Sequence, residues 1–157
     1  MTHHHLTMSS PVGELLLTAE DDALTGLFLA AEQRAPEPES VEGGPFLDDV
    51  RDQLAGYFDG SRRAFDIALA PPGTDWQRRV WGELERIPFG ATITYAELAR
   101  RAGNPTAIRA AGAANGRNPI SIVIPCHRVV GTDGRLTGYS GGLDAKRWLL
   151  DHEEAGR

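Results

Sequence analysis

The stretch Ile124-Pro125-Cys126-His127-Arg128-Val129-Val130 holds the only cysteine of this 157-residue chain, with a histidine directly after it. A lone cysteine in an intracellular protein is most often a small buried apolar residue. The alternative is a nucleophile, for which a neighbouring base generates the thiolate and a constrained turn presents it. Pro125 fixes one backbone angle just before the cysteine, which suits this second role. A proton transfer to His127 would need a water or a bend, because adjacent side chains on extended backbone point in opposite directions.

Two further motifs flank the cysteine. An alanine-rich segment, Arg109-Ala-Ala-Gly-Ala-Ala-Asn-Gly-Arg-Asn-Pro119, lies upstream, and Tyr139-Ser140-Gly141-Gly142 lies downstream. In this order the motifs resemble the O6-alkylguanine-DNA alkyltransferase family (methylated-DNA–protein-cysteine methyltransferases). The resemblance is dense from about Thr74 to Glu153, over half of the chain, and looser before it.

The resemblance implies direct reversal of DNA damage. The protein would bind double-stranded DNA in the minor groove, flip O6-alkylguanine out of the stack and transfer the alkyl group irreversibly to Cys126, once per molecule. His127 would act as a base through a water, and Glu153 would orient it and stabilise its charge. Arg128 is expected to be structural. A displacement at carbon by a thiolate needs no metal and no organic cofactor, and we expect neither.

The resemblance also assigns residues to the pocket for the flipped base. Tyr95 would face the base and assist its protonation, and Asn118 would hold the cysteine turn together. The backbone groups of Val129 and Ser140 would read the guanine edge, while Tyr139 would form a pocket wall. These five positions are the expected substrate-binding residues.

Three residues are expected at the DNA. Arg109 would enter the base stack in place of the flipped guanine, and the small side chains around it would let its helix approach a minor groove closely. Asn104 and Thr132 match family positions near the DNA backbone. Ser121 stands where some relatives have a proline, and Asn115 stands where some have a larger apolar residue, so the tolerance for bulky alkyl groups stays open.

The chain divides best at Ala70-Pro71-Pro72-Gly73, into residues 1–72 and 73–157. The patterns predict an α/β (α+β) protein whose first part is a small antiparallel sheet with one helix, which the resemblance identifies as ribonuclease-H-like. Proline, glutamate and glycine indicate a mobile loop over Glu32–Gly44. The expected elements are strands at His4–Ser10, Glu14–Ala19, Ala23–Ala30 and Phe65–Leu69, and a helix over Phe46–Phe58.

The second part is predicted to be mostly helical. Thr74 and Gln77 form a capping-box pattern at the start of its first helix. Two short helices joined by Gly103-Asn104-Pro105 make a helix-turn-helix candidate, in which Thr106 can cap the second helix. A final helix is expected over Leu143–Glu153. We expect this part to be the DNA-binding and alkyl-acceptor domain.

The net charge of −6 is unusual for a DNA-binding protein, but it is unevenly distributed. The first 72 residues have 4 basic and 13 acidic side chains, whereas the remaining residues have 12 and 9. This asymmetry is consistent with DNA contact confined to the second part. The sequence contains no long apolar run, so we expect no membrane span. It shows no charged-then-apolar leader, so we expect no secretion signal. A free thiol fits the reducing cytoplasm. We expect a monomer, while cooperativity on DNA stays open.

Two other classes of function compete with alkyl transfer. Alkyltransferase-like proteins bind the same lesion without removing the alkyl group, but they typically have tryptophan where Cys126 stands. A cysteine hydrolase or thiol redox sensor would explain Cys126 and His127. It would leave Arg109 and the Tyr-Ser-Gly-Gly motif without a role.

Overall fold

The first part of the chain forms a sheet covered by one helix in this computed structural model, which describes residues 1–156. β1 (His3–Met8), β2 (Leu15–Glu20) and β3 (Ala23–Leu29) form an antiparallel meander, which is followed by a single 3₁₀ turn, η1 (Ala30–Glu32). The short β4 (Val41–Glu42) pairs in parallel with β1, so the strand order is β3-β2-β1-β4. The expected small antiparallel sheet is confirmed. β4 is an addition, since it lies in the stretch interpreted as a loop.

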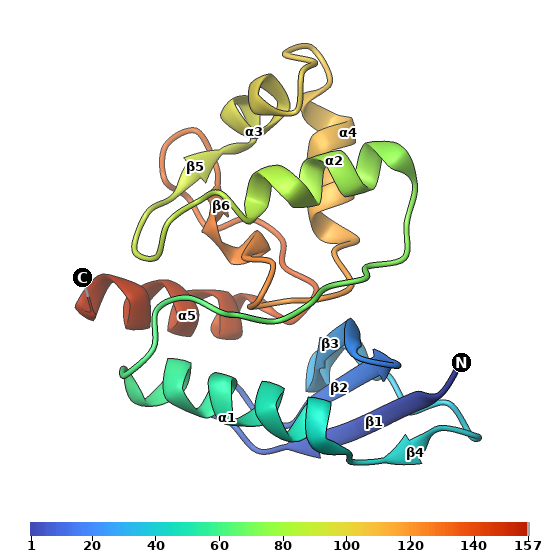
Figure 1. Cartoon of the computed structure of the whole chain (residues 1–157). Coiled ribbons are helices and arrows are strands. Elements are labelled where there is room, and N and C mark those ends of the chain that lie inside the picture. Colours follow the sequence, from blue (N-terminus) through green and yellow to red (C-terminus); the bar gives the residue numbers. More distant parts are fainter. Residues whose placement is uncertain (157) are drawn as a thin grey trace.

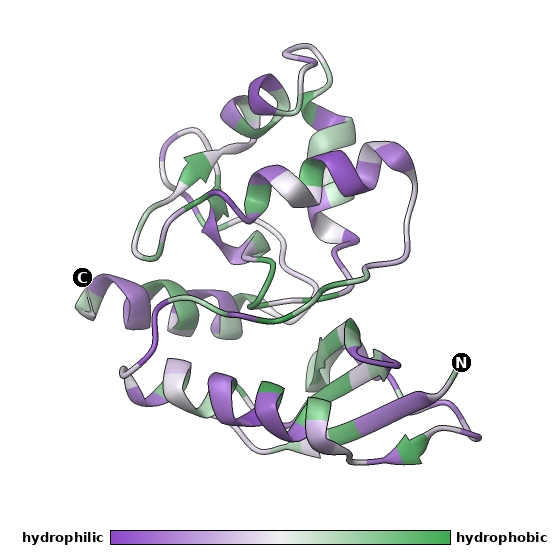
Figure 2. Cartoon of the chain, viewed as in Figure 1, coloured by the Kyte–Doolittle hydropathy of each residue, from purple (hydrophilic) through white to green (hydrophobic). Residues whose placement is uncertain are grey.

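The helix α1 (Pro45–Asp59) lies beside this sheet (Figure 1) because both elements have an apolar face. Leu15 and Leu17 alternate along β2 with no exposed surface, and Leu54 and Tyr57 are buried on α1. Figure 2 shows hydrophobic residues along the strands and along α1, interspersed with hydrophilic ones. The helix ends at Gly60, whose φ of 88° is in the region that favours glycine.

The predicted strand at Phe65–Leu69 is wrong. This segment makes only an isolated bridge to β3, between Leu69 and Leu24. The Leu24 N–H donates to the Ala68 carbonyl, and the Ala70 N–H donates to the Leu24 carbonyl, both at 2.8 Å. At Asp66 the side chain of Gln53 takes the place of a neighbouring strand, because it accepts from the backbone N–H at 2.9 Å and donates to the carbonyl at 3.0 Å. The segment therefore crosses the sheet edge as a connection to the second part.

The second part is mostly helical, as expected, with one two-stranded pairing. Its helices and strands, in order, are α2 (Asp75–Leu84), β5 (Ile93–Thr94), α3 (Tyr95–Arg101), α4 (Ile108–Gly116), the 3₁₀ turn η2 (Cys126–Arg128), β6 (Val129–Val130) and α5 (Leu143–Ala155). β5 and β6 are parallel. No helix among residues 1–156 is both long and apolar enough to cross a membrane.

The helix-turn-helix is formed by α3 and α4, which pack against each other. Thr94 caps α3 by accepting from the Glu97 N–H at 3.1 Å. The predicted cap at Thr106 is wrong: its hydroxyl donates to the side chain of Asn104 at 2.9 Å, and α4 begins after Ala107 without a side-chain cap. The short polar side chains in the turn satisfy one another rather than the helix end.

The capping box predicted at Thr74 and Gln77 is confirmed at the start of α2, and α2 packs against α4. The indole N–H of Trp81 donates to the Ala114 carbonyl at 2.8 Å in the core, and that of Trp76 donates to the Ala110 carbonyl at 3.2 Å nearer the surface. Two tryptophans of one helix thus fix the position of the neighbouring helix along its length.

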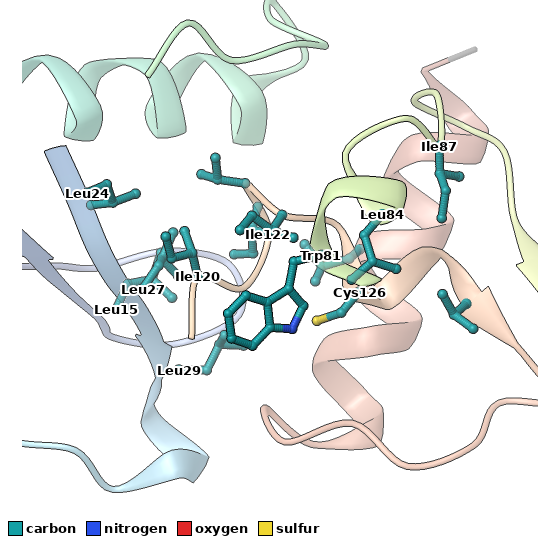
Figure 3. Packing of buried hydrophobic residues seen from close by; sticks show 14 of the residues in the cluster. Leu15, Leu24, Leu27, Leu29, Trp81, Leu84, Ile87, Ile120, Ile122 and Cys126 are labelled. Atoms are coloured by element: carbon teal, nitrogen blue, oxygen red, sulfur yellow. The ribbon is translucent and has the colours of Figure 1, made fainter. Parts of the chain in front are cut away.

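The two parts of the chain share a continuous apolar core. The Leu27 N–H of β3 donates to the Pro119 carbonyl at 2.9 Å, and the Ser121 N–H donates back to the Leu27 carbonyl at 3.2 Å. Figure 3 shows the leucines of the sheet on one side of Ile120 and Ile122, with Trp81 and Cys126 on the other. The first part therefore holds the segment that leads into Cys126.

We predict that Trp81→Phe lowers the free energy of unfolding by about 1–3 kcal/mol, because it removes the indole N–H that donates to the buried Ala114 carbonyl of α4. Trp76→Phe removes the equivalent bond near solvent and should cost clearly less. Urea unfolding of both variants measures the difference. Equal losses would show that the two indole bonds do not differ as their burial indicates.

Candidate functional site

The turn that presents Cys126 is held from within by Asn118. The side-chain amide of Asn118 donates to the Ile124 carbonyl at 2.7 Å, and its oxygen accepts from the Ile120 N–H at 3.0 Å. The Ile124 N–H donates to the Ile120 carbonyl at 3.0 Å, which closes the loop. Ile122 has a φ of 73°, a conformation that is costly for a β-branched residue. The surrounding hydrogen bonds maintain this strained turn, a feature that recurs at functional sites.

The thiol of Cys126 is almost fully buried, at the start of the 3₁₀ turn η2. The backbone here is helical rather than extended, so adjacent side chains project roughly 120° apart instead of in opposite directions. Burial raises the pKa of the Cys126 thiol, and the neighbouring side chains of Asn118 and Ser121 and the charge of Lys146 counteract it.

The imidazole of His127 is paired with Glu153 of α5, as expected for an oriented base. The His127 Nε2–Glu153 Oε2 distance is 2.7 Å, and neither side chain has more than 1% exposed surface. Because a carboxylate only accepts, Nε2 carries the hydrogen and Nδ1 keeps its lone pair. Burial lowers the pKa of His127, against the opposing effect of Glu153. The resting site therefore contains a neutral imidazole with Nδ1 available as a base.

Arg128 is structural, as expected, and it also contacts the carboxylate of Glu153. Its Nε lies 2.7 Å from Oε1 and its Nη2 lies 3.0 Å from Oε2, while Nη1 donates to the Ile87 carbonyl at 2.6 Å. The Tyr57 hydroxyl of α1 donates to Oε2 at 2.6 Å. Burial alone would raise the pKa of Glu153, but the bonds and charges of His127 and Arg128 outweigh it and hold the pKa far below its usual range.

Several buried polar atoms near the thiol have no hydrogen-bond partner among residues 1–156. They are Asn115 Oδ1, Ser121 Oγ, His127 Nδ1 and Tyr139 Oη. Each such atom typically costs about 1–3 kcal/mol when it stays unpaired. Their concentration around one buried thiol indicates a site built for a polar ligand or for bridging water.

The loop between β6 and α5 forms the other side of the site. The Thr137 hydroxyl donates to the Tyr95 hydroxyl at 2.7 Å, and the ammonium of Lys146 donates to the carbonyls of Val129 and Thr137 at 2.7 and 3.2 Å. A Cβ on Gly141 would lie 2.7 Å from the Leu29 side chain of β3, so any larger residue would force a neighbouring side chain to shift. The first part of the chain thus also supports the Tyr-Ser-Gly-Gly loop.

The predicted site residues fall into three groups. Cys126, His127, Glu153, Asn118 and Val129 are buried together around the cysteine turn. Tyr95, Tyr139 and Ser140 lie at the edge of that site, where the Ser140 hydroxyl faces the Glu32 carboxylate. The three residues assigned to DNA, Arg109, Asn104 and Thr132, form the third group and are exposed. No three His, Cys, Asp or Glu side chains within residues 1–156 gather in a way that could hold a metal ion.

Two residues of the site were missed by the sequence analysis. Tyr57 was interpreted only as an apolar contact of its helix. Lys146 was not considered, although it shares a helix face with Leu149 and Glu153 at intervals of three and four residues. Its position on the same helix face as an apolar residue could have predicted that Lys146 is buried.

We predict that Asn118→Ala lowers the free energy of unfolding by about 2–3 kcal/mol, because it breaks the bonds that close the cysteine turn and leaves backbone groups unpaired. Asn115→Ala is the matched control, since its amide makes a single bond of 3.4 Å to the Cys126 carbonyl. Denaturant unfolding of both variants tests the difference. An Asn118→Ala loss no larger than that of Asn115→Ala would contradict this role.

Comparison with known proteins agrees with the geometry of both parts. Residues 3–71 match the model of the 6-O-methylguanine DNA methyltransferase ribonuclease-like domain, and residues 75–155 match that of the DNA binding domain of the same family. A methylated-DNA–protein-cysteine methyltransferase of Methanosarcina acetivorans is 45% identical over 152 residues, which cover 96% of this chain and 97% of the relative. One of Mycobacterium tuberculosis is 45% identical over 154 residues, covering 97% and 93%.

Solved structures show the same likeness. The crystal structure of the Mycobacterium tuberculosis O6-methylguanine methyltransferase superposes with a TM-score of 0.90 at 42% identity, covering 99% of this chain and 95% of that one. The structure of the same organism's OGT in complex with DNA has a TM-score of 0.89 at 44% identity, with 98% and 94% covered. This chain therefore belongs to the 6-O-methylguanine DNA methyltransferase family, the methylated-DNA–protein-cysteine methyltransferases.

Proposed function

We propose that the protein repairs O6-alkylguanine in duplex DNA by moving the alkyl group onto the sulfur of Cys126. The observation that carries this assignment is the buried Cys126 beside a neutral His127 whose Nδ1 is unpaired and whose Nε2 is held by Glu153. Such an arrangement can remove a thiol proton without a metal. The family's DNA-bound relative supports DNA as the partner.

The reaction balances with the groups at hand. His127 takes the proton of Cys126 through a water, and the thiolate attacks the alkyl carbon. A sulfur–carbon bond forms while the bond from that carbon to O6 breaks, and the electron pair goes to the guanine. The guanine takes up a proton at its ring nitrogen from the hydroxyl of Tyr95, and the thiol proton held by His127 is released to solvent, from which Tyr95 regains one. A thioether does not hydrolyse readily, so each molecule acts once.

The target carbon must leave the base stack before this attack, since the duplex shields it. α4 consists mostly of alanine and glycine after Arg109, so few bulky side chains surround this arginine. Arg109 is exposed and makes no ion pair within residues 1–156. We assign Arg109 to the space left by the flipped guanine in the minor groove, and Asn104 and Thr132 to the DNA backbone. The unpaired atoms of Ser121 and Tyr139 would face the flipped base, together with backbone groups of Val129 and Ser140.

The acceptor must be reduced before it can act, and a free cysteine fits the reducing cytoplasm. We assign the protein there as a monomer that meets one lesion at a time.

The test is the intact mass of the protein after mixing with a duplex that contains one O6-methylguanine. We predict a gain of one methyl group, mapped to Cys126, with no gain from unmodified duplex. Cys126→Ala should bind the same duplex with no gain in mass.

Other outcomes would overturn the proposal in different ways. Tight binding by the wild-type protein without a mass change would indicate a lesion-binding protein of the alkyltransferase-like class. A methyl group mapped to another residue would remove Cys126 from its role.

A further inference from the structure

We infer that Tyr57, from the first part of the chain, is a positioning residue that sets the strength of the proton relay formed by His127 and Glu153. The inference rests on the proposed function, because that function gives the relay its role. Tyr57 lies on α1, 96 positions before Glu153, and has no exposed surface. Its hydroxyl donates to Glu153 Oε2 at 2.6 Å, as short as any bond that the carboxylate accepts.

The hydroxyl of Tyr57 competes with His127 for one oxygen atom. Glu153 Oε2 accepts from Tyr57 at 2.6 Å, from His127 Nε2 at 2.7 Å and from Arg128 Nη2 at 3.0 Å. Each donor draws electron density from that oxygen, so each weakens its attraction for the others. Tyr57 therefore limits how well Glu153 can stabilise a protonated His127.

Both ends of Tyr57 are fixed to α5. The side chain of His152, adjacent to Glu153, hydrogen-bonds the Tyr57 carbonyl at 2.6 Å, and the two rings meet edge-on with centroids 5.1 Å apart. Phe89 packs edge-on against the same ring at 6.1 Å. This packing holds the ring in place, and the absence of exposed surface keeps water from replacing Glu153 as the acceptor of the hydroxyl.

The charges around His127 and Glu153 make the pKa of His127 sensitive to any change at Glu153. Burial and the charge of Glu153 raise the pKa of Tyr57, so its hydroxyl stays protonated and remains a donor. Arg128 and the buried Lys146 face His127 with positive charge and oppose its protonation, whereas Glu153 favours it. A change in the basicity of Glu153 should therefore appear as a change in the pKa of His127.

The test is nitrogen NMR of the imidazole of His127 across a pH series. Tyr57→Phe keeps the buried ring and removes the competing donor. The pKa of His127 should rise by about half a unit to one unit, because Glu153 is then free to stabilise the imidazolium. The acidic limb of the rate–pH profile for methyl transfer should move in the same direction. Site-specific 3-fluorotyrosine at position 57 donates more strongly and should lower the pKa of His127.

The control is Phe58→Leu. Phe58 packs against the rings of Tyr57 and Trp148 in the same interface but touches no relay group. It should lower the melting temperature without changing the pKa of His127. An unchanged pKa in both Tyr57 variants, or a rate reduced equally at every pH, would reduce Tyr57 to a packing residue and overturn the inference. The titration needs no substrate, so a wild-type protein that transfers no methyl group would overturn only the proposed function.

Discussion

The carboxylate of Glu153 carries a negative charge with almost no contact with water. Hydrogen-bond donors from distant parts of the chain stabilise that charge. An unpaired buried charge would cost several kcal/mol. Donors from two elements and one turn meet it here: Tyr57 from α1, His127 and Arg128 from η2, and more distantly the Gly90 N–H at 3.4 Å. A group that needs so many partners can exist only where distant parts of the chain are brought together.

This requirement explains why an acidic sheet domain accompanies a DNA-binding helical domain. α1 supplies a donor to Glu153, β3 pairs with the segment that leads into the cysteine turn, and Leu29 packs against Gly141 of the Tyr-Ser-Gly-Gly loop. The first part thus contacts the site at three places, although none of the expected catalytic residues belongs to it. Stability of the domain junction and geometry of the relay depend on the same hydrogen bonds.

The sequence was informative where a local pattern determines the structure. The capping box at Thr74, the helix-turn-helix and the cysteine turn follow from neighbouring residues, and the resemblance placed Glu153 beside His127. It failed where a distant side chain decides the outcome. Gln53 replaces the strand partner expected along Phe65–Leu69, and Tyr57 has the spacing of an ordinary core residue. Nothing local reveals that its hydroxyl meets a carboxylate 96 positions away.

Replacement of Glu153 by Gln tests the central claim most directly, because the amide keeps the shape and removes the charge. Unfolding free energy and the single-turnover rate of methyl transfer would be measured on the same sample, with DNA at saturation. We predict that stability falls by about 3–5 kcal/mol, since the amide turns a donor toward other donors. The transfer rate should fall at every pH because His127 loses its fixed tautomer. Near-normal stability together with a near-normal rate would contradict the account.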